Sequence, residues 1–405
     1  MQMNSNDDRK AREIVRIIYA SAGASDLVNA HKHWESAGDS SLQVSKTFSG
    51  QIAQFCADNR IHCLMLSTNC ERQHYQNGLF TVKHLPKRSA HGWRFHYGEL
   101  AYALRLLVES RRFGASHALV DSGTTHFFLL SLFRLFNIKL VPILHNAVWP
   151  NGFPPRRKVA RAILRLNGLF WRYVPYATLV VSPVIRRQIE EICPQYRGKI
   201  SEFRAQFDKS VFDAIPPPPD FFSSPFTIMF VGRADHSKGI IDLADIAHLV
   251  ERKIPGRVRW IVCGDGPDLH ALRQKISKCG NSSLFEIKGH VKPIDLMTLY
   301  REVHAVIVPT RSSFAEGLAM TAIEAVLAGR PVITSSVVPA LELIRSSCVE
   351  AITDNCESYA TAVTQLATDE SFYDSLRTSK SCLVDEFTDD MAGLRNALSQ
   401  TIVIF

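Results

Sequence analysis

The stretch EGLAMTAIEAVLAGRPVI, from Glu316 to Ile333, has the pattern of a helix followed by a strand. Small and apolar residues surround Glu324, as in a helix packed against a sheet or a ligand. Gly329 and Pro331 end this helix, and the β-branched residues after them begin a strand. The unit predicts an α/β fold. It also raises the question of why one carboxylate, Glu316, precedes the helix and a second lies within it.

The same alternation of short apolar strands and longer amphipathic segments continues in both directions from this stretch. Continuous β-branched runs separated by helix-length segments are typical of parallel strands that are buried on both faces. We therefore expect two doubly wound α/β domains. The expected strands are 14–19, 61–67, 117–122, 139–144 and 178–182 in the first half and 227–232, 258–264, 284–289, 305–309 and 331–335 in the second.

The clearest linker is AIPPPPDFFSSP at residues 214–225, where four consecutive prolines form a stiff, extended spacer. We expect an N-terminal domain over residues 1–213 and a C-terminal domain over residues 226–385. The last segment, about 386–405, is expected to form a helix that packs back on the first domain.

The chain has 405 residues, of which 46% are hydrophobic and 21% charged, as in a globular protein of two domains. The most apolar segment, His126–Leu144, is interrupted by Arg134 and Lys139, so we expect no transmembrane helix. The first residues lack the apolar core of a secretory signal. None of the nine cysteines forms a CxxC pair, which favours reduced thiols and a cytoplasmic location.

Charge is unevenly divided between the two halves. Residues 1–205 contain 28 Lys and Arg against 14 Asp and Glu, whereas the remainder contains 19 against 25. A basic first half indicates an anionic partner, such as a membrane surface, a phosphorylated substrate or a nucleic acid. No nucleic-acid recognition module is present, so we expect no nucleic-acid partner.

Two motifs in the second half follow strands directly and have the features of an anion site. In FVGRADHSKG, Gly232 permits a tight turn, and Arg233 and Lys238 precede a helix; two cations beside a helix N-terminus bind anions. An ordinary solvated loop is the alternative. In VCGDGP, Gly264 follows the next strand in the same way, and FEIKGHV ends a further strand whose backbone could contact a planar base.

The two carboxylates of the opening stretch fit opposite ends of one long ligand. Residues 317–320 lead into the helix, so their N–H groups are free to bind an anion such as a diphosphate. Glu316 could instead act only as a favourable helix-dipole charge, and Glu324 as a surface residue. A hydrolase would need the carboxylates about 5–10 Å apart, whereas eight helical residues span about 12 Å. A nucleotide-sugar has hydroxyl groups at both ends and fits that spacing.

These three motifs, in this order and spacing, resemble the donor domain of the retaining GT-B glycosyltransferases of family 4, glycosyl transferases group 1. The E-x7-E pattern is the mark of that family, and the resemblance covers roughly residues 226–360. It implies that Arg233 and Lys238 hold the donor diphosphate and stabilise the charge of the leaving group. It implies that Glu316 binds hydroxyls of the transferred sugar and Glu324 the ribose.

The resemblance also implies roles for backbone groups. Leu318 and Ala319 would contact phosphate, and His290 or Val291 would contact the base. The family commonly has Gly-Phe-Gly after the first Glu, whereas this chain has Gly317, Leu318 and Ala319. The resemblance implies no metal and no cofactor, because the departing diphosphate assists the attack on the same face of the sugar.

In the first half, polar residues follow three expected strands. The family's Gly-rich loop is reduced here to SAGASD, in which only Gly23 is a glycine. His145 resembles the catalytic histidine that faces the cleft in the family. Asp121 and Ser122 follow a neighbouring strand and are expected either in the site or at a helix N-cap.

The segment Pro154–Val174 combines six basic residues with Ile, Leu, Phe and Trp side chains. A basic amphipathic helix with aromatics at its end suits an anionic membrane surface, and a domain helix with a charged outer face is the alternative. We therefore expect a protein of the cytoplasm, peripheral at the inner face of the cell membrane.

The sequence predicts a retaining, metal-independent hexosyltransferase. Its donor would be a UDP- or GDP-sugar, and its acceptor a lipid-linked glycan or another saccharide in bacterial polysaccharide synthesis. Two other classes stay open: a catalytically silent GT-B subunit that binds a partner enzyme, and a nucleotide-sugar epimerase. An epimerase needs acid and base groups around the sugar, and the sequence contains no evident set of them.

Overall fold

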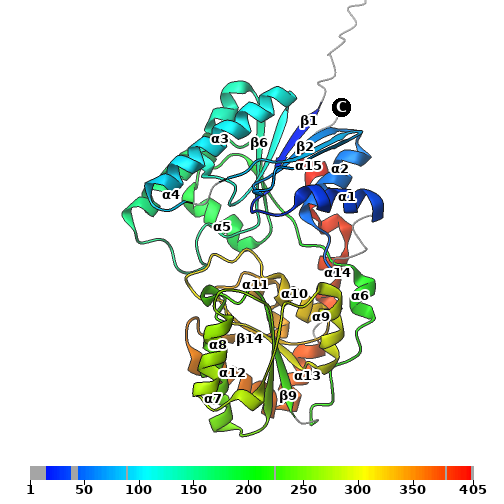
Figure 1. Cartoon of the computed structure of the whole chain (residues 1–405), viewed down its shortest axis with the longest axis vertical. Coiled ribbons are helices and arrows are strands. Elements are labelled where there is room, and N and C mark those ends of the chain that lie inside the picture. Colours follow the sequence, from blue (N-terminus) through cyan, green and yellow to red (C-terminus); the bar gives the residue numbers. More distant parts are fainter. Residues whose placement is uncertain (1–14, 38–43, 88–89, 223–224, 379–380, 403–405) are drawn as a thin grey trace, which may run out of the picture.

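The chain of this computed structural model forms two separate sheets, one in each half of the sequence, which lie one above the other in Figure 1. The structure describes residues 15–37, 44–87, 90–222, 225–378 and 381–402. Helices cover both faces of each sheet, because the apolar runs of the inner strands must be buried on both sides.

The first sheet has eight strands in the order β3-β4-β2-β1-β5-β6-β7-β8. Its strands are β1 Arg16–Ala20, β2 His62–Ser67, β3 His74–Asn77, β4 Phe80–His84, β5 His117–Asp121, β6 Lys139–Leu144, β7 Ala177–Val180 and β8 Lys199–Glu202. Its helices are α1 Leu27–Ala37, α2 Phe48–Asp58, α3 Trp93–Phe113, the 3-10 segment η1 Phe127–Phe136, α4 Lys158–Tyr173, α5 Pro183–Ile192 and α6 Lys209–Asp213.

The second sheet has six strands in the order β11-β10-β9-β12-β13-β14. These strands are β9 Phe226–Val231, β10 Val258–Cys263, β11 Phe285–Gly289, β12 Ala305–Val308, β13 Val332–Ser335 and β14 Cys348–Ala351. The helices that cover it include η2 His236–Lys238, α7 Asp242–Lys253, α8 Leu269–Lys278, α9 Pro293–Leu299, α10 Met320–Leu327, α11 Ala340–Ile344, α12 Cys356–Thr368 and α13 Glu370–Thr378.

Successive side chains of the inner strands enter different cores. In β9, Met229 belongs to one buried cluster, together with α9 and α10, whereas Ile228 and Phe230 belong to another, together with α7 and α12. Alternate residues of a strand point to opposite faces, so a run of apolar residues without polar interruption is needed where both faces are covered.

Of the four strands at the sheet edges, the sequence predicted only β11, and it missed β3, β8 and β14 together with β4, the neighbour of β3. β3 and β4 form a hairpin across Gly78, and β3 runs antiparallel to β4, so the expectation of a wholly parallel sheet is wrong at this edge. The strands β8 and β14 have four residues each and were also missed. Edge strands are short and partly exposed, so they lack the apolar run that identified the inner strands.

The last helices of the chain return to the first sheet. After α14 (Ser381–Thr388), α15 (Leu394–Thr401) lies against α2, as Figure 1 shows. The N–H of Leu394 donates to Oε1 of Gln51 at 3.0 Å, and Leu398 is fully buried.

The order of strands reverses once in each sheet. In the first sheet the chain moves from β1 to β2 on one side and later places β5 on the other side of β1. In the second sheet, β10 and β12 flank β9 in the same way. The loops that follow the strands at such a reversal diverge and leave a crevice at their carboxyl ends, where ligands of doubly wound folds bind.

Candidate functional site

The loops after β9 and β12 bring together Lys238 and Glu316, two charged side chains that the sequence assigned separately to the donor site. Nζ of Lys238 lies 2.5 Å from Oε2 of Glu316, and Oγ1 of Thr310 donates to the same oxygen at 3.3 Å. The Lys238 ammonium also lies 4.1 Å from the centre of the Phe314 ring. Glu316 is buried and Lys238 is partly buried, so this charge pair faces a restricted space rather than bulk solvent.

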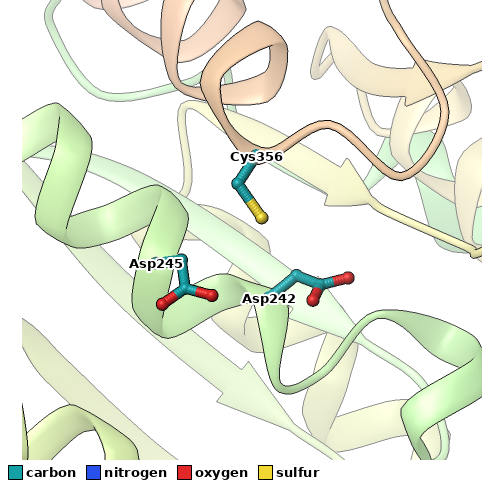
Figure 2. Close-up of side chains that lie close together, drawn as sticks. All are labelled: Asp242, Asp245 and Cys356. Carbon is teal, nitrogen blue, oxygen red and sulfur yellow. The ribbon is translucent and has the colours of Figure 1, made fainter.

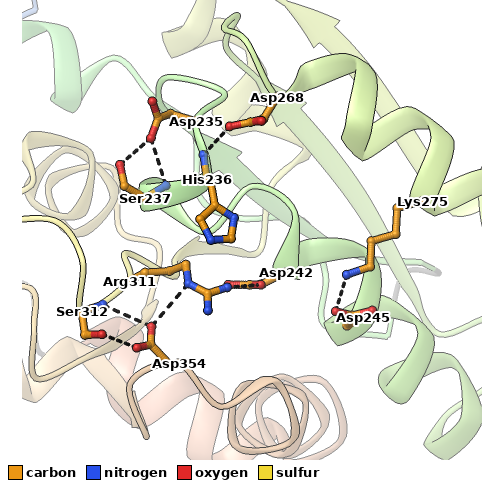
Figure 3. Close-up of polar contacts among 10 residues, drawn as sticks. All are labelled: Asp235, His236, Ser237, Asp242, Asp245, Asp268, Lys275, Arg311, Ser312 and Asp354. Carbon is orange, nitrogen blue, oxygen red and sulfur yellow. Dashed lines mark hydrogen bonds and ion pairs between the residues drawn. The ribbon is translucent and has the colours of Figure 1, made fainter. Parts of the chain in front are cut away.

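A network of short polar contacts holds the loop that carries Lys238 (Figure 3). The Asp235 carboxylate accepts from the hydroxyl of Ser237 and from its N–H at 2.9 Å, and these two hydrogen bonds lower the pKa of Asp235. The Asp268 carboxylate accepts from the N–H of His236 at 2.6 Å. The N–H of Arg311 donates to the carbonyl of Ser237 at 3.0 Å. The loop is therefore fixed in shape before a ligand arrives, which favours anion binding.

A cavity of about 320 Å³ adjoins this loop at the carboxyl ends of β9 and β10. The guanidinium of Arg233 lies beside it, 58% exposed and 3.3 Å from the Asp235 carboxylate. Five residues that the sequence assigned to the donor site line this one cavity: Gly232, Arg233, Gly264, His290 and Val291. The structure thus brings together three motifs that are separated in the chain.

Glycine is required at the floor of this cavity. Gly264 has a φ of 142°, and a Cβ atom there would lie 1.7 Å from the carbonyl oxygen of Gly232. A Cβ atom at Gly266 would lie 2.5 Å from the carbonyl oxygen of Ala234. The two loops are packed backbone to backbone, which is possible only without side chains.

The helix α10 begins at Met320, so the expected separation of Glu316 and Glu324 by eight helical residues is wrong. Only the five residues from Met320 to Glu324 are helical, and the four steps between them rise about 6 Å. Glu316 and Glu324 differ instead in the groups that surround their carboxylates. No hydrogen bond to the Glu324 carboxylate occurs among the described residues, and burial raises its pKa to about 7. Burial and the Glu324 charge raise the pKa of Tyr300.

The turn into α10 is strained at Ala319, whose φ of 70° and ψ of 80° are left-handed. Glycine adopts this region freely, whereas alanine does so at a cost of about 1–2 kcal/mol. Among the described residues, the N–H groups of Gly317, Leu318 and Ala319 have no backbone acceptor. They are therefore available to an anion in front of the helix.

We expect the substitution Ala319→Gly to stabilise the protein. The left-handed strain disappears, and the extra flexibility of the unfolded chain offsets part of the gain, so the free energy of unfolding should rise by about 0.5–1 kcal/mol. Urea unfolding measures this difference. A lower stability would show that Ala319 is not held in a left-handed conformation.

The first half contributes His145, which follows β6. Its Nε2 lies 2.9 Å from Oδ1 of Asp121, its ring stacks on Phe48 at 4.2 Å, and its buried Nδ1 has no partner among the described groups. The hydroxyl of Tyr19 donates to Oδ2 of Asp121 at 2.7 Å. Asp121 thus orients the imidazole through Nε2, so that any further contact must be made by Nδ1.

Asp121 and Ser122 lie together with His145 rather than at a helix N-cap. The Ser122 hydroxyl accepts from the N–H groups of His145 and Asn146 at 3.0 and 3.1 Å. The N-cap alternative is wrong, because the residues before η1 form a turn and His126 precedes η1. Gly23 is exposed with a φ of 79°, and its carbonyl oxygen accepts from Thr68.

The two halves meet directly between Gly317 and His145. A Cβ atom at Gly317 would lie 1.5 Å from the carbonyl oxygen of His145 and 3.1 Å from Cα of Asn146. Beside this contact, a second cavity of about 540 Å³ opens toward the first half. Its lining includes Ser122, Asn146 and Leu164 from the first half and Ala315, next to Glu316, from the second.

Several residues of the site gave no signal in the sequence. Tyr19, Phe48, Thr310 and Phe314 support His145 or the Lys238–Glu316 pair, but each is an ordinary apolar or hydroxyl side chain in its own segment. Only Thr310 was detectable in principle, because it follows directly after the expected strand 305–309.

Asp242, Asp245 and Cys356 form the single group with metal-ligand spacing among the described residues (Figure 2). Arg311 lies 2.8 Å from the Asp242 carboxylate and Lys275 lies 2.5 Å from that of Asp245, so both charges have a partner (Figure 3). Burial raises the pKa of the Cys356 thiol to about 11, which disfavours the thiolate that a metal binds. The group is better explained as an ion-pair network that holds α7, α8 and α12 together.

Among the described helices, none is long and apolar enough to cross a membrane.

Comparisons with solved structures define the class of fold. A sucrose-phosphate synthase from Thermosynechococcus elongatus is 15% identical, with a TM-score of 0.69 and coverage of 95% of this chain and 98% of that one. Anabaena HepE in complex with UDP is 13% identical, with a TM-score of 0.65 and coverage of 96% and 99%. The two facing α/β units of this chain are the GT-B fold.

A family match covers part of the chain. Residues 211–380, which lie almost wholly in the second half, match the family described as glycosyl transferases group 1. A curated relative, 2-deoxystreptamine N-acetyl-D-glucosaminyltransferase of Niallia circulans, is 30% identical over 110 residues. That match spans 27% of this chain and 27% of the length of the relative.

Proposed function

We propose that the protein is a retaining glycosyltransferase that moves a hexose from a nucleotide-diphosphate sugar to an acceptor. The observation that carries this proposal is the fixed arrangement of Lys238, Glu316 and Arg233 around the crevice of the second sheet. Cations on a rigid loop, free N–H groups before α10 and a cavity at the strand ends suit a diphosphate with a base attached. The family match of residues 211–380 and the UDP in HepE support the same class of donor.

The charges of the site suggest how the donor is accepted. Without a ligand, Lys238 is paired with Glu316. A diphosphate beside Lys238 competes for the ammonium and frees the Glu316 carboxylate to accept hydrogen bonds from sugar hydroxyls. Glu324, on the first turns of α10, is left to accept hydrogen bonds from the ribose.

The transfer step balances without a protein base. The bond between the anomeric carbon and the phosphate oxygen breaks, and its electron pair stays with the diphosphate, next to Arg233 and Lys238. The acceptor oxygen attacks the same face of the sugar and gives its proton to the departing phosphate oxygen. The cations stabilise the charge that develops on the leaving group, the largest contribution that the residues of this site offer. We propose that neither a metal nor a cofactor takes part.

Calorimetry with UDP, GDP and ADP tests the donor site. We expect one nucleotide to bind, and Glu324→Gln to weaken it about tenfold, through loss of charge-assisted hydrogen bonds to the ribose. Glu324 with a pKa of about 7 is neutral below that pH and ionised above it. The affinity for the nucleotide-sugar should therefore rise between pH 6 and pH 8 in the wild type, and stay level in Glu324→Gln. If no nucleotide binds to the folded protein, the transferase proposal fails and a silent subunit becomes the better explanation.

A turnover assay separates the remaining classes. Transfer of sugar to an acceptor supports the proposal, isomerised donor indicates an epimerase, and neither product indicates a silent subunit. The pairing of Lys238 with Glu316 beside the crevice supports the first outcome.

We also propose that the acceptor is carried by a lipid, as in bacterial polysaccharide synthesis. The residues that favour this are α3, η1 and α4 with their flanks, which we name the outer face; η1 contacts both helices, and α3 and α4 lie on one flank in Figure 1. Among the described residues, the outer face holds fourteen of the eighteen large hydrophobic side chains that are exposed: Trp93, Phe95, Tyr97, Leu100, Leu104, Val108, Leu135, Phe136, Phe153, Val159, Leu166, Leu169, Tyr173 and Tyr176.

Cations surround these apolar side chains, and carboxylates are rare. Eleven Arg and Lys residues of the outer face are exposed, against one partly exposed carboxylate, Glu109, which pairs with Lys83. Apolar side chains among cations match the interface of an anionic bilayer. The segment 154–174 is thus one part of the proposed membrane surface, and α3 is a second part that the sequence did not indicate.

Sedimentation with vesicles tests the membrane proposal. The protein should bind vesicles of equal parts phosphatidylcholine and phosphatidylglycerol, and Leu104→Ser and Leu169→Ser should each weaken binding about tenfold. Ile352→Ser removes an apolar side chain that is equally exposed but lies in the second half, and should have no effect. Equal binding by all variants would contradict docking through the outer face.

A further inference from the structure

A large cavity in the first half lies apart from the residues assigned to the donor chemistry. It measures about 1120 Å³ and lies between the β3–β4 hairpin and the first turns of α3. We name it the basic groove. Its fifteen lining residues are Arg72, Gln73, His74, Lys83, His84, Pro86, Lys87, Ala90, Trp93, Arg94, Tyr97, Gly98, Ala101, Tyr102 and Arg105.

The basic groove carries an excess of positive charge. Five of the lining residues are Lys or Arg, and none is Asp or Glu. Two cations have partners behind the lining: Lys83 lies 2.5 Å from Glu109, and Lys87 lies 2.5 Å from Glu99. The three arginines have no carboxylate partner among the described residues. Unpaired guanidinium groups around a concave surface raise the local concentration of anions and suit phosphate oxygens.

Aromatic side chains complete the lining. Trp93 and Tyr97 are 74% and 68% exposed, and the guanidinium of Arg94 lies 5.7 Å from the Trp93 ring. Burial raises the pKa of the Tyr102 hydroxyl, so this side chain adds no negative charge to the groove at neutral pH. A wall of aromatic faces with a few fixed cations is the composition of a small-molecule site rather than of a solvated surface.

The basic groove leads toward the reaction centre. Lys87 lines both this groove and the 540 Å³ cavity, and that cavity reaches Ala315, next to Glu316. The Lys87 ammonium also donates to the carbonyl of Thr124 at 2.8 Å, so the connecting residue is held in place. A ligand in the groove can therefore extend one end toward the transferred sugar.

We infer that the basic groove binds the phosphate-bearing part of the acceptor, a phosphate or diphosphate attached to a sugar. The inference rests on the proposed transferase function, because it names the chemistry of the acceptor. Arg72, Arg94 and Arg105 contact the phosphate oxygens, and Trp93 and Tyr97 pack against the attached sugar ring. Arg105 also donates to the carbonyl of Pro86 at 2.8 Å, which fixes one side of the groove.

The test uses calorimetry on the full chain with inorganic pyrophosphate and with glucose 1-phosphate. To remove pyrophosphate bound at the donor loop, both titrations are made in the background Arg233→Gln with Lys238→Gln. We expect pyrophosphate to bind in that background. Adding the pair Arg72→Gln and Arg94→Gln should weaken the affinity for pyrophosphate at least tenfold. The pair Arg252→Gln with Lys278→Gln removes the same charge from exposed sites of the second half and should have no effect.

One further variant separates groove binding from a general charge effect. Trp93→Ala, at an exposed position, should weaken the binding of glucose 1-phosphate several-fold and leave the binding of pyrophosphate unchanged. If the groove variants bind pyrophosphate as the background does, or if nothing binds, the inference is overturned. If the groove variants lose only the binding to vesicles that contain phosphatidylglycerol, the groove holds a lipid headgroup and not the acceptor. Nucleotide binding in the wild type is independent of these outcomes, so the donor proposal is judged separately.

Discussion

Replacing Lys238 by glutamine is expected to slow sugar transfer by about 100-fold to 1,000-fold, because it removes a fixed cation from the leaving diphosphate. The ammonium lies 2.5 Å from Glu316 on a loop held by Asp235 and Asp268, so no other described lysine can take its place. The loss should appear mainly in kcat, since the charge on the diphosphate grows in the transition state. Steady-state rates with the nucleotide-sugar found by calorimetry measure the effect.

The control for this variant is Lys275→Gln, which removes a lysine from the same half whose partner is Asp245. It should transfer sugar at the wild-type rate. Because Lys238→Gln leaves Glu316 without its partner, unfolding must be measured in parallel, and Glu316→Gln in the Lys238→Gln background should restore stability but not activity. Wild-type turnover by Lys238→Gln would remove this residue from the mechanism.

The second large effect is expected from Gly317→Ala. The added Cβ would lie 1.5 Å from the carbonyl oxygen of His145, so the backbone of one half must move relative to the other. A displacement of about 1 Å between the reacting groups costs on the order of 100-fold in rate. The overlap lies between the halves and not within either core, so nucleotide binding by the second half should persist while transfer is lost.

The control is Gly256→Ala, at a position where the added Cβ meets nothing within 4 Å but φ is 68°. It should reduce stability by about 1 kcal/mol through backbone strain and leave transfer unchanged. If Gly317→Ala transfers sugar normally, the halves do not meet at His145 during the reaction.

Much of the candidate donor site was predictable because its residues directly follow apolar strands. Gly232, Arg233 and Gly264 come after β9 and β10, and parallel strands present their carboxyl ends at one edge of a sheet. The pairing of Lys238 with Glu316 was not predictable. It joins side chains 78 residues apart, and it depends on β12 lying beside β9 rather than beside β11.

The contacts around His145 in the first half could not be predicted from the sequence. His145 was identified by resemblance, but its bond to Asp121, its stacking on Phe48 and its contact with Gly317 all cross between elements. None of these partners stands at a characteristic spacing in the sequence.

The sequence by itself determined two doubly wound units, the turns that carry the donor cations, and a basic first half. Apolar runs and glycine positions act over a few residues, so they can be recognised without a structure. Three features could be known only from the tertiary structure: which loops meet at the reversals of strand order, the contact of Gly317 with His145, and the gathering of the cations beside the β3–β4 hairpin and on α3 around one groove. The physical reason is that contacts between distant segments depend on strand order and on the packing between the halves, neither of which leaves a periodic trace in the chain.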